Sequence, residues 1–157
     1  MSNQKKILII NRGEIATRIA KACRELGHVA VGVWTDNELN AKHLEFCHEW
    51  VHLQGSTNAE TYLNIDNIFK VIKENEIDAV HPGYGFLSES CEFARKLSKE
   101  NIIFIGPHVE AVRQMGDKAI SKQIAKAADI PVIPGSASAI PTVAEAKKIA
   151  KEIGYPI

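Results

Sequence analysis

The sequence has few cysteines, no excess of either charge and no long apolar run. Its three cysteines, Cys23, Cys47 and Cys91, are odd in number and form no Cys-x-x-Cys pair. This argues against a disulfide framework or a zinc ribbon and favours a reduced, cytoplasmic compartment. Lys plus Arg and Asp plus Glu both number 19, so no charge footprint for nucleic acid exists. The apolar run near the N-terminus is too short for a signal peptide or a membrane span.

Repeats and low-complexity tracts are also missing, and strand-like apolar runs alternate with helical periodicity along all 157 residues. This alternation predicts the α/β class, with a Rossmann-like parallel sheet, right-handed crossovers and helices on both faces. The expected strands are 6–10, 28–34, 50–53, 79–81 and 102–105. The expected helices are 15–26, 41–47, 65–72, 89–100, 109–115, 119–128 and 143–153.

The segment His-Pro-Gly-Tyr-Gly-Phe-Leu-Ser-Glu, residues 81–89, follows an apolar run that is typical of a buried strand. In open α/β sheets, ligands bind in the crevice outside the carboxyl ends of the strands. Two interpretations remain open. Gly83 and Gly85 either serve only a tight turn, or form a ligand-facing loop in which Tyr84 supplies a ring or hydroxyl. We expect His81 to be a hydrogen-bonded structural histidine rather than a catalytic one.

Two other motifs, the turn 11–14 and the segment 48–52, give weaker evidence of a binding site than the segment 81–89. The turn Asn11, Arg12, Gly13, Glu14 lacks the glycines of a dinucleotide fingerprint, so Asp36 is expected to be a turn residue rather than a ribose ligand.

The segment 48–52 reads His-Glu-x-x-His, a zinc motif that requires a helix. On a strand, His48 and His52 would lie ~13 Å apart, too far for one zinc ion. No metal ligands are therefore predicted, and no Ser/His/Asp or Cys/His catalytic group is found.

Two sets of charged residues on predicted helices each allow a structural role or a binding role. Asp117 fits a helix N-cap after Gly116 as a C′ residue, and Lys118 could instead reach a phosphate. Arg18 and Arg24, on the polar side of the first helix, suit either a solvated face or a partner contact.

Several segments in order along the chain resemble the N-terminal part of biotin carboxylase, the ATP-dependent component of biotin-dependent carboxylases. They are Ile-Ile-Asn-Arg-Gly-Glu-Ile-Ala (9–16), Tyr-Leu-Asn-Ile (62–65), the segment 81–89, Phe-Ile-Gly-Pro (104–107), Met-Gly-Asp-Lys (115–118) and Gly-Tyr-Pro (154–156). The resemblance implies a pre-ATP-grasp domain over residues 1–115, followed by the start of an ATP-grasp domain over 116–157.

The resemblance also implies a reaction in which ATP, with Mg²⁺, activates bicarbonate to carboxylate biotin on a carrier protein. Lys118 would contact the ATP phosphates, and Tyr84 and Gly85 would lie beside the biotin ureido ring. Arg18 matches a dimer-interface position, and the turn from Asn11 to Glu14 would face the same cleft. The implied partners are a biotin carboxyl carrier protein, a carboxyltransferase and a second copy of the enzyme.

The sequence ends where a new strand is expected to begin, at residues 155–157, which suggests a fragment of a longer protein. By the resemblance, the ATP lid and the metal-binding glutamates would follow Ile157, so we expect no turnover by the fragment. Two alternatives stay open: a non-catalytic dimerisation or binding module, and a related ligase of the carbamoyl-phosphate or purine-pathway type.

Overall fold

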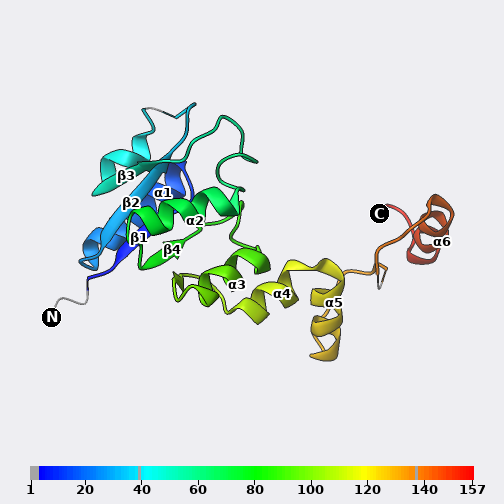
Figure 1. The fold of residues 1–157 in the computed structure, drawn as a ribbon. Helices are drawn as coiled ribbons and strands as arrows, with labels where there is room; N and C mark the ends of the chain where they lie inside the picture. The colour runs from blue at the N-terminus through cyan, green and yellow to red at the C-terminus, as the bar shows by residue number, and fades with distance from the viewer. Residues whose placement is uncertain (1–3, 39, 137) are drawn as a thin grey trace. The chain divides into compact units, whose positions relative to one another are not determined.

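The computed structural model describes residues 4–38, 40–136 and 138–157, and these form two compact units (Figure 1). The first unit, Met1–Val109, contains a β-sheet with helices, and the second, Glu110–Ile157, is helical.

The sheet of the first unit is parallel throughout, as predicted. Within the described residues it has five strands in the order β3-β2-β1-β4-β5. Strand β1 is central, and its Leu8 pairs with Val31 on one side and Val80 on the other. The strands are β1 (Lys6–Ile9), β2 (Val29–Trp34), β3 (Glu49–His52), β4 (Ala79–His81) and β5 (Ile103–Phe104).

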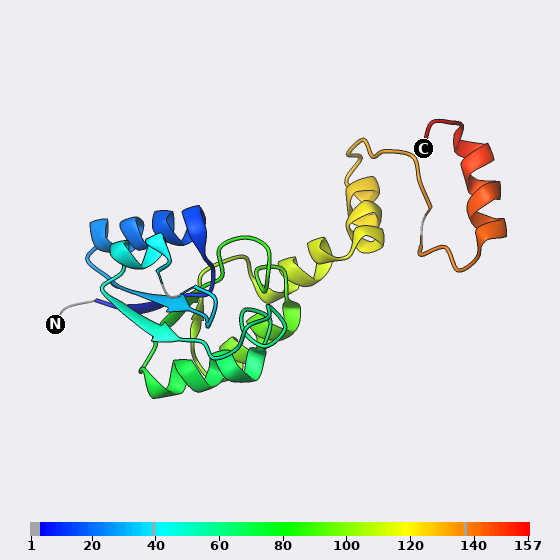
Figure 2. The same cartoon turned by 90° about the horizontal axis from the view of Figure 1, so that it is seen from above.

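Helices cover both faces of the sheet (Figure 2). Helix α1 (Gly13–Glu25) and the 3₁₀ helix η1 (Lys42–Phe46) lie on one face, and α2 (Ile65–Glu74) and α3 (Cys91–Lys99) lie on the other. Because successive side chains of a strand point to opposite faces, β1 and the residue after it serve both cores. Leu8 and Ile10 pack with α2 and α3, whereas Ile7 and Ile9 pack with α1.

The buried stripe of helix α1 ends before Leu26, the last residue of the predicted helix. Ala16, Ile19, Ala20 and Cys23 are buried against the sheet, but Leu26 at the end of the helix is 73% exposed. Leu26 is the C-cap of α1, where the chain turns back toward β2, so it lies beyond the last turn that packs on the sheet.

Helix boundaries follow the capping side chains. Helix α3 begins at Cys91, two residues later than predicted, because the Ser90 side chain caps it by accepting from Phe93 N. In the second unit, Gly116 is the last residue of α4 (Val109–Gly116) rather than the residue after it. Asp117 caps α5 as predicted, accepting from Ala119 N and Ile120 N.

The second unit consists of α4, α5 (Lys118–Ala127) and α6 (Val143–Ile153), with few buried side chains.

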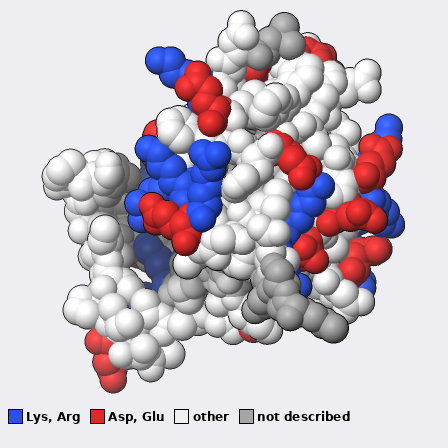
Figure 3. Space-filling model, turned by 90° about the vertical axis from the view of Figure 1, so that its left-hand side faces the viewer, with Lys and Arg blue, Asp and Glu red and all other residues white. Residues whose placement is uncertain are grey.

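Among the residues that the structure describes, none of the helices has the length and apolar character needed to span a membrane. On the face shown in Figure 3, basic and acidic side chains lie interspersed, in keeping with a net charge of zero.

Three phenylalanines form the centre of the core beneath α2 and α3. The Phe93 ring is fully buried and meets Phe69 and Phe104 edge to face, with ring centroids 6.1 and 6.4 Å apart. Such pairs add to the free energy gained by burying the rings.

We therefore expect Phe93→Ala to lower the free energy of unfolding of the first unit by about 3–5 kcal/mol, through lost burial and a cavity. Urea denaturation followed by circular dichroism measures this. The control is Leu26→Ala, which removes an exposed side chain and should change stability by no more than about 0.5 kcal/mol. Equal losses in the two variants would contradict the assignment of Phe93 to the core.

Candidate functional site

The order of the strands defines a candidate site at the carboxyl ends of β1 and β4. From β1 the chain continues outward through β2 to β3, and then crosses to β4 and β5 on the other side of β1. The loops after β1 and β4 therefore flank the point where the strand order reverses, which is where open α/β sheets bind ligands. These loops are residues 10–12 and 82–90, and they overlap the two segments singled out by sequence, 11–14 and 81–89.

The Asn11 side chain joins the two loops. It is only 4% exposed, and its Nδ2 donates to the carbonyl oxygens of Pro82, at 2.8 Å, and Tyr84, at 2.7 Å. Its Oδ1 accepts from Arg12 N at 2.9 Å. All the polar hydrogens of this buried amide are thus used, and the loop after β4 is tied to the end of β1.

Gly83 and Gly85 both have φ of +66°, in the left-handed region that favours glycine. Both glycines therefore take the backbone of a tight turn that the sequence predicts. A Cβ at Gly83 would come 2.8 Å from Asn11 Nδ2, so the two chains approach too closely for a side chain there. At Gly85 a Cβ would meet nothing within 4 Å, so this side of the loop is open.

His81 has the structural role expected of it. Its Nδ1 accepts a hydrogen bond from Gly83 N at 3.0 Å, which shapes the start of the turn. Burial lowers the pKa of His81, and this favours the neutral ring that can accept at Nδ1.

Tyr84 presents its ring to solvent and is 60% exposed. Its hydroxyl donates to the carboxylate of Glu14, in the first turn of α1, and this hydrogen bond raises the pKa of the Tyr84 hydroxyl. Tyr84 is therefore held at its carbonyl by Asn11 and at its hydroxyl by Glu14.

Arg12 lies in a cluster that sequence reasoning did not find. Its Nη1 pairs with Glu38 Oε1 at 2.7 Å, and Tyr62 donates to the other Glu38 oxygen at 2.6 Å. The guanidinium lies 5.5 Å from the ring centroids of both Tyr62 and Phe86, which are themselves stacked 4.8 Å apart. Tyr62 belongs to a matched family segment, whereas nothing local to Glu38 indicated its partners.

The cluster shifts the ionisation of its members. Burial alone raises the pKa of Glu38, but the hydrogen bonds from Tyr62 and Arg12 outweigh it and hold the pKa below its ordinary value. Glu38 is therefore a carboxylate that joins the loop after β2 to Arg12 in the loop after β1.

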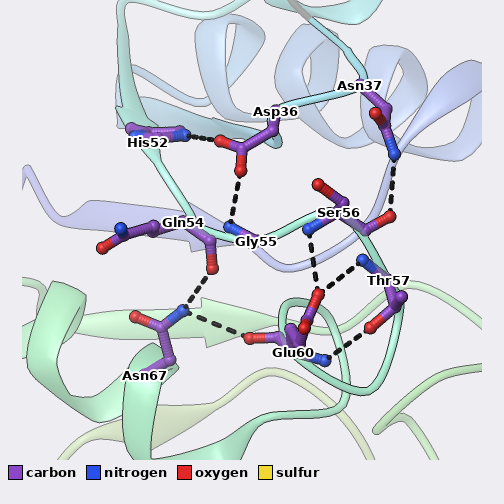
Figure 4. A network of polar contacts seen from close by, with 9 residues as sticks. All are labelled: Asp36, Asn37, His52, Gln54, Gly55, Ser56, Thr57, Glu60 and Asn67. Carbon is purple, nitrogen blue, oxygen red and sulfur yellow. Dashed lines mark hydrogen bonds and ion pairs between the residues drawn. The ribbon is translucent and has the colours of Figure 1, made fainter.

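Asp36 stabilises a neighbouring loop and is not arranged as a ribose ligand. Its Oδ1 lies 2.6 Å from His52 Nε2, and its Oδ2 accepts from Gly55 N at 3.3 Å (Figure 4). Glu60 accepts from two further backbone N–H groups of residues 54–60. The turn-residue interpretation of Asp36 is confirmed by these contacts.

The His-Glu-x-x-His segment lies on strand β3, as predicted, instead of on a helix. His48 Nδ1 accepts from Ala30 N at 3.0 Å, and His52 stacks on Trp34 with ring centroids 4.0 Å apart. Both imidazoles thus have structural partners in the sheet.

All three cysteines are free thiols. Burial raises the pKa of Cys23, and it raises the pKa of Cys47 to about 11. These two side chains are protonated at neutral pH and act as packing residues beneath α1.

The two remaining predicted site residues are Arg18, in the first unit, and Lys118, in the second. Arg18 is exposed on α1 and lines an apolar groove of about 480 Å³ with Ile19, Leu26 and Ile103. Lys118 begins α5 in the second unit and lines a pocket of about 400 Å³. The other residues around this pocket include Asp117, Lys122, Ser136 and Ser138. Its lysines and hydroxyls suit an anion.

The parallel sheet with paired loops at its switch point defines a Rossmann-like α/β domain of the ligand-binding kind. Residues 3–112 match the family model of the biotin carboxylase N-terminal domain, and residues 117–157 match that of the carbamoyl-phosphate synthase L chain ATP binding domain. The match to the biotin carboxylase N-terminal domain covers well over half of this chain. The chain therefore belongs to that family.

Curated relatives agree with this. The chain is 46% identical over 153 residues to the 2-oxoglutarate carboxylase small subunit of Hydrogenobacter thermophilus, covering 98% of this chain and 32% of the relative. It is 43% identical to biotin carboxylase 1 of Bacillus subtilis, in a match that covers 98% of this chain and 34% of the relative. For the human mitochondrial propionyl-CoA carboxylase alpha chain the identity is 44%, covering 97% and 21%. The chain thus spans between 21% and 34% of the length of these relatives.

Solved structures resemble the chain with sequence identities similar to those of the curated relatives. One is the dimeric biotin carboxylase domain of H. thermophilus 2-oxoglutarate carboxylase with MgADP, ADP and bicarbonate. It has a TM-score of 0.90 and 45% identity, covering 99% of this chain and 34% of that one. The biotin carboxylase–β,γ-ATP complex from Campylobacter jejuni has a TM-score of 0.87 and 45% identity, covering 97% and 34%.

The two glycines of the loop after β4 predict unequal effects of the same substitution. Gly85→Ala should cost roughly 1–2 kcal/mol, because only the left-handed backbone is strained. Gly83→Ala adds displacement of Asn11 and its two buried hydrogen bonds, for about 1–3 kcal/mol more. Chemical denaturation of both variants measures the difference, and equal stabilities would contradict the close approach at Gly83.

Glu38 predicts a pH dependence of stability. Because its pKa is lowered in the folded state, its contribution is present above the ordinary value of 4.5 and is lost as pH falls through the folded pKa. Glu38→Gln should cost about 1–3 kcal/mol at pH 7 and progressively less toward pH 3.

Denaturation curves of wild type and Glu38→Gln between pH 3 and 7 test this expectation. The control is Glu74→Gln, which removes an exposed i,i+4 pair with Lys70 and should have little effect throughout. A stability difference for Glu38→Gln that does not change with pH would show that the carboxylate charge is not what stabilises the cluster.

Proposed function

We propose that the chain is the N-terminal part of a biotin carboxylase, an ATP-dependent ligase that uses bicarbonate to carboxylate biotin on a carrier protein. The observation that carries this is the match over nearly the whole chain, in sequence and in fold, to biotin carboxylases. On this proposal, residues 1–115 form the pre-ATP-grasp domain and residues 116–157 begin the ATP-grasp domain. The succession of the two family models supports this division.

In the first unit, Tyr84 and Gly85 are proposed to lie beside the biotin ureido ring. The residues present fit a flat ligand, because the Tyr84 ring is exposed and a Cβ added at Gly85 would meet nothing within 4 Å. The turn from Asn11 to Glu14 is proposed to face the same cleft, and its side chains contact the loop that carries Tyr84.

In the second unit, Lys118 is proposed to contact the ATP phosphates. It lines a pocket with a second lysine, Lys122, and with Ser136 and Ser138, which suits a polyanion. ATP supplies the phosphoryl group that activates bicarbonate, with Mg²⁺ as its counterion. Within the described part of the chain, no group of three or more His, Cys, Asp or Glu lies close enough together to hold a metal ion.

The proposed partners are a biotin carboxyl carrier protein, a carboxyltransferase and a second copy of the enzyme. Arg18 is proposed to lie at the dimer interface, which its exposure on α1 beside an apolar groove supports. The dimeric state of the H. thermophilus domain is consistent with this. We propose a cytoplasmic location, supported by the three free cysteines.

A second candidate is a related ligase of the carbamoyl-phosphate type, because residues 117–157 match the carbamoyl-phosphate synthase ATP binding domain. The two candidates differ in one requirement. A biotin carboxylase cleaves ATP in response to added biotin, and a carbamoyl-phosphate enzyme does not.

The test uses the full-length protein that contains this chain, assayed for ATP cleavage that depends on biotin and bicarbonate. Lys118→Ala should reduce kcat/KM by on the order of 10²-fold, because it removes the positive charge that contacts the phosphates. Lys126→Ala, an exposed lysine of the same helix outside the pocket, is the control and should retain activity. Full activity of Lys118→Ala would remove this residue from the site, and turnover without biotin would favour the second candidate.

A further inference from the structure

The loop that carries Tyr84 and Gly85 is held by side chains from one short turn, residues 11–14. We infer that Asn11 and Glu14 are the positioning residues of this loop, Asn11 for its backbone and Glu14 for the Tyr84 ring. This inference rests on the proposed function, since it gives Tyr84 and Gly85 their place beside biotin.

Asn11 fixes the backbone because its two donors reach the carbonyls on either side of Gly83. The C=O and N–H of a planar trans peptide point in opposite directions. With the Tyr84 carbonyl directed at Asn11, the Gly85 N–H is directed away from Asn11. A loop with two left-handed glycines has many accessible conformations, and these hydrogen bonds select one of them.

Asn11 itself has little freedom. It is buried, it directly follows a residue whose N–H donates to the His81 carbonyl at 3.1 Å, and its own Oδ1 accepts from Arg12 N. The anchor of the loop is therefore a buried residue directly after the central strand, and rigid strands place a site more precisely than loops do.

Asn11 holds the backbone of Tyr84, and Glu14 holds the hydroxyl at the far end of its side chain. Its carboxylate accepts from the Tyr84 hydroxyl, while the neighbouring cation, Arg12, is paired with Glu38 instead. The exposed Tyr84 ring is thus held in one orientation before any ligand arrives. Preorganisation of this kind raises affinity because the side chain loses less freedom on binding.

The test measures KM for free biotin, KM for ATP and kcat in the full-length protein. Asn11→Ala should raise the biotin KM about tenfold and leave the ATP KM within about twofold, because two hydrogen bonds to the loop are lost. The matched control is Asn37→Ala, which removes a side-chain hydrogen bond to the Ser56 carbonyl and should leave both values unchanged. An unchanged biotin KM in Asn11→Ala would overturn the role of Asn11.

Glu14 is tested by a conservative pair, whose result does not depend on whether Asn11→Ala folds. Glu14→Ala should raise the biotin KM about threefold to tenfold, and Glu14→Gln should restore it, because the amide oxygen still accepts from Tyr84. In a Tyr84→Phe background, Glu14→Ala should have no further effect. Equal biotin KM values for Glu14→Ala and wild type would overturn the role of Glu14.

A second readout does not require turnover. NMR titration of ¹³C-labelled tyrosine, assigned with Tyr84→Phe, should show a lower pKa for Tyr84 in Glu14→Gln than in wild type, because the carboxylate raises it. If the wild-type protein cleaves no ATP in response to biotin, the proposed function fails. The titration then decides the Glu14–Tyr84 contact by itself, and an unshifted Tyr84 pKa would overturn that contact.

Discussion

The central position of strand β1 is the constraint on which the rest of the first unit depends. Its side chains are buried on both faces, so one set must pack under α1 and the other under α2 and α3. Because β1 pairs with β2 on one side and β4 on the other, the loops that follow β1 and β4 meet at the same edge. The Asn11 amide then needs to span only one strand spacing to join them.

The polar groups at this edge are satisfied by one another, and this explains how a site with glycine-rich backbone stays ordered. Arg12, Glu38 and Tyr62 form one charged cluster over the Phe86 ring, and Asn11, Glu14 and Tyr84 form a second set. Within the described residues no buried side-chain N or O atom lacks a hydrogen-bond partner. Asn11 is the buried member, and because its side chain is fully paired it rigidifies the loops around it, whereas an unpaired amide there would destabilise them.

Much of the fold could be predicted because the signals are local. The continuous apolar run of β1, the stop at Gly27 and the Asp117 cap each act within a few residues, and each was predicted correctly. One error arose where packing decides the outcome: Leu26 continues the apolar period of α1 but extends past the sheet. The late start of α3 is a different error, because the Ser90 cap that sets it is a local signal and was overlooked.

The candidate site divides in the same way. The sequence by itself determined the chemistry available at residues 11–14 and 81–89: an aromatic ring, glycines for left-handed turns, and an amide and carboxylate nearby. Only the tertiary structure decided that Asn11 and Glu14 hold Tyr84, about 70 residues away, and that Glu38 holds Arg12. Such pairings depend on which strands become neighbours, and this is set by the burial of the whole sheet and not by the residues adjacent to either partner.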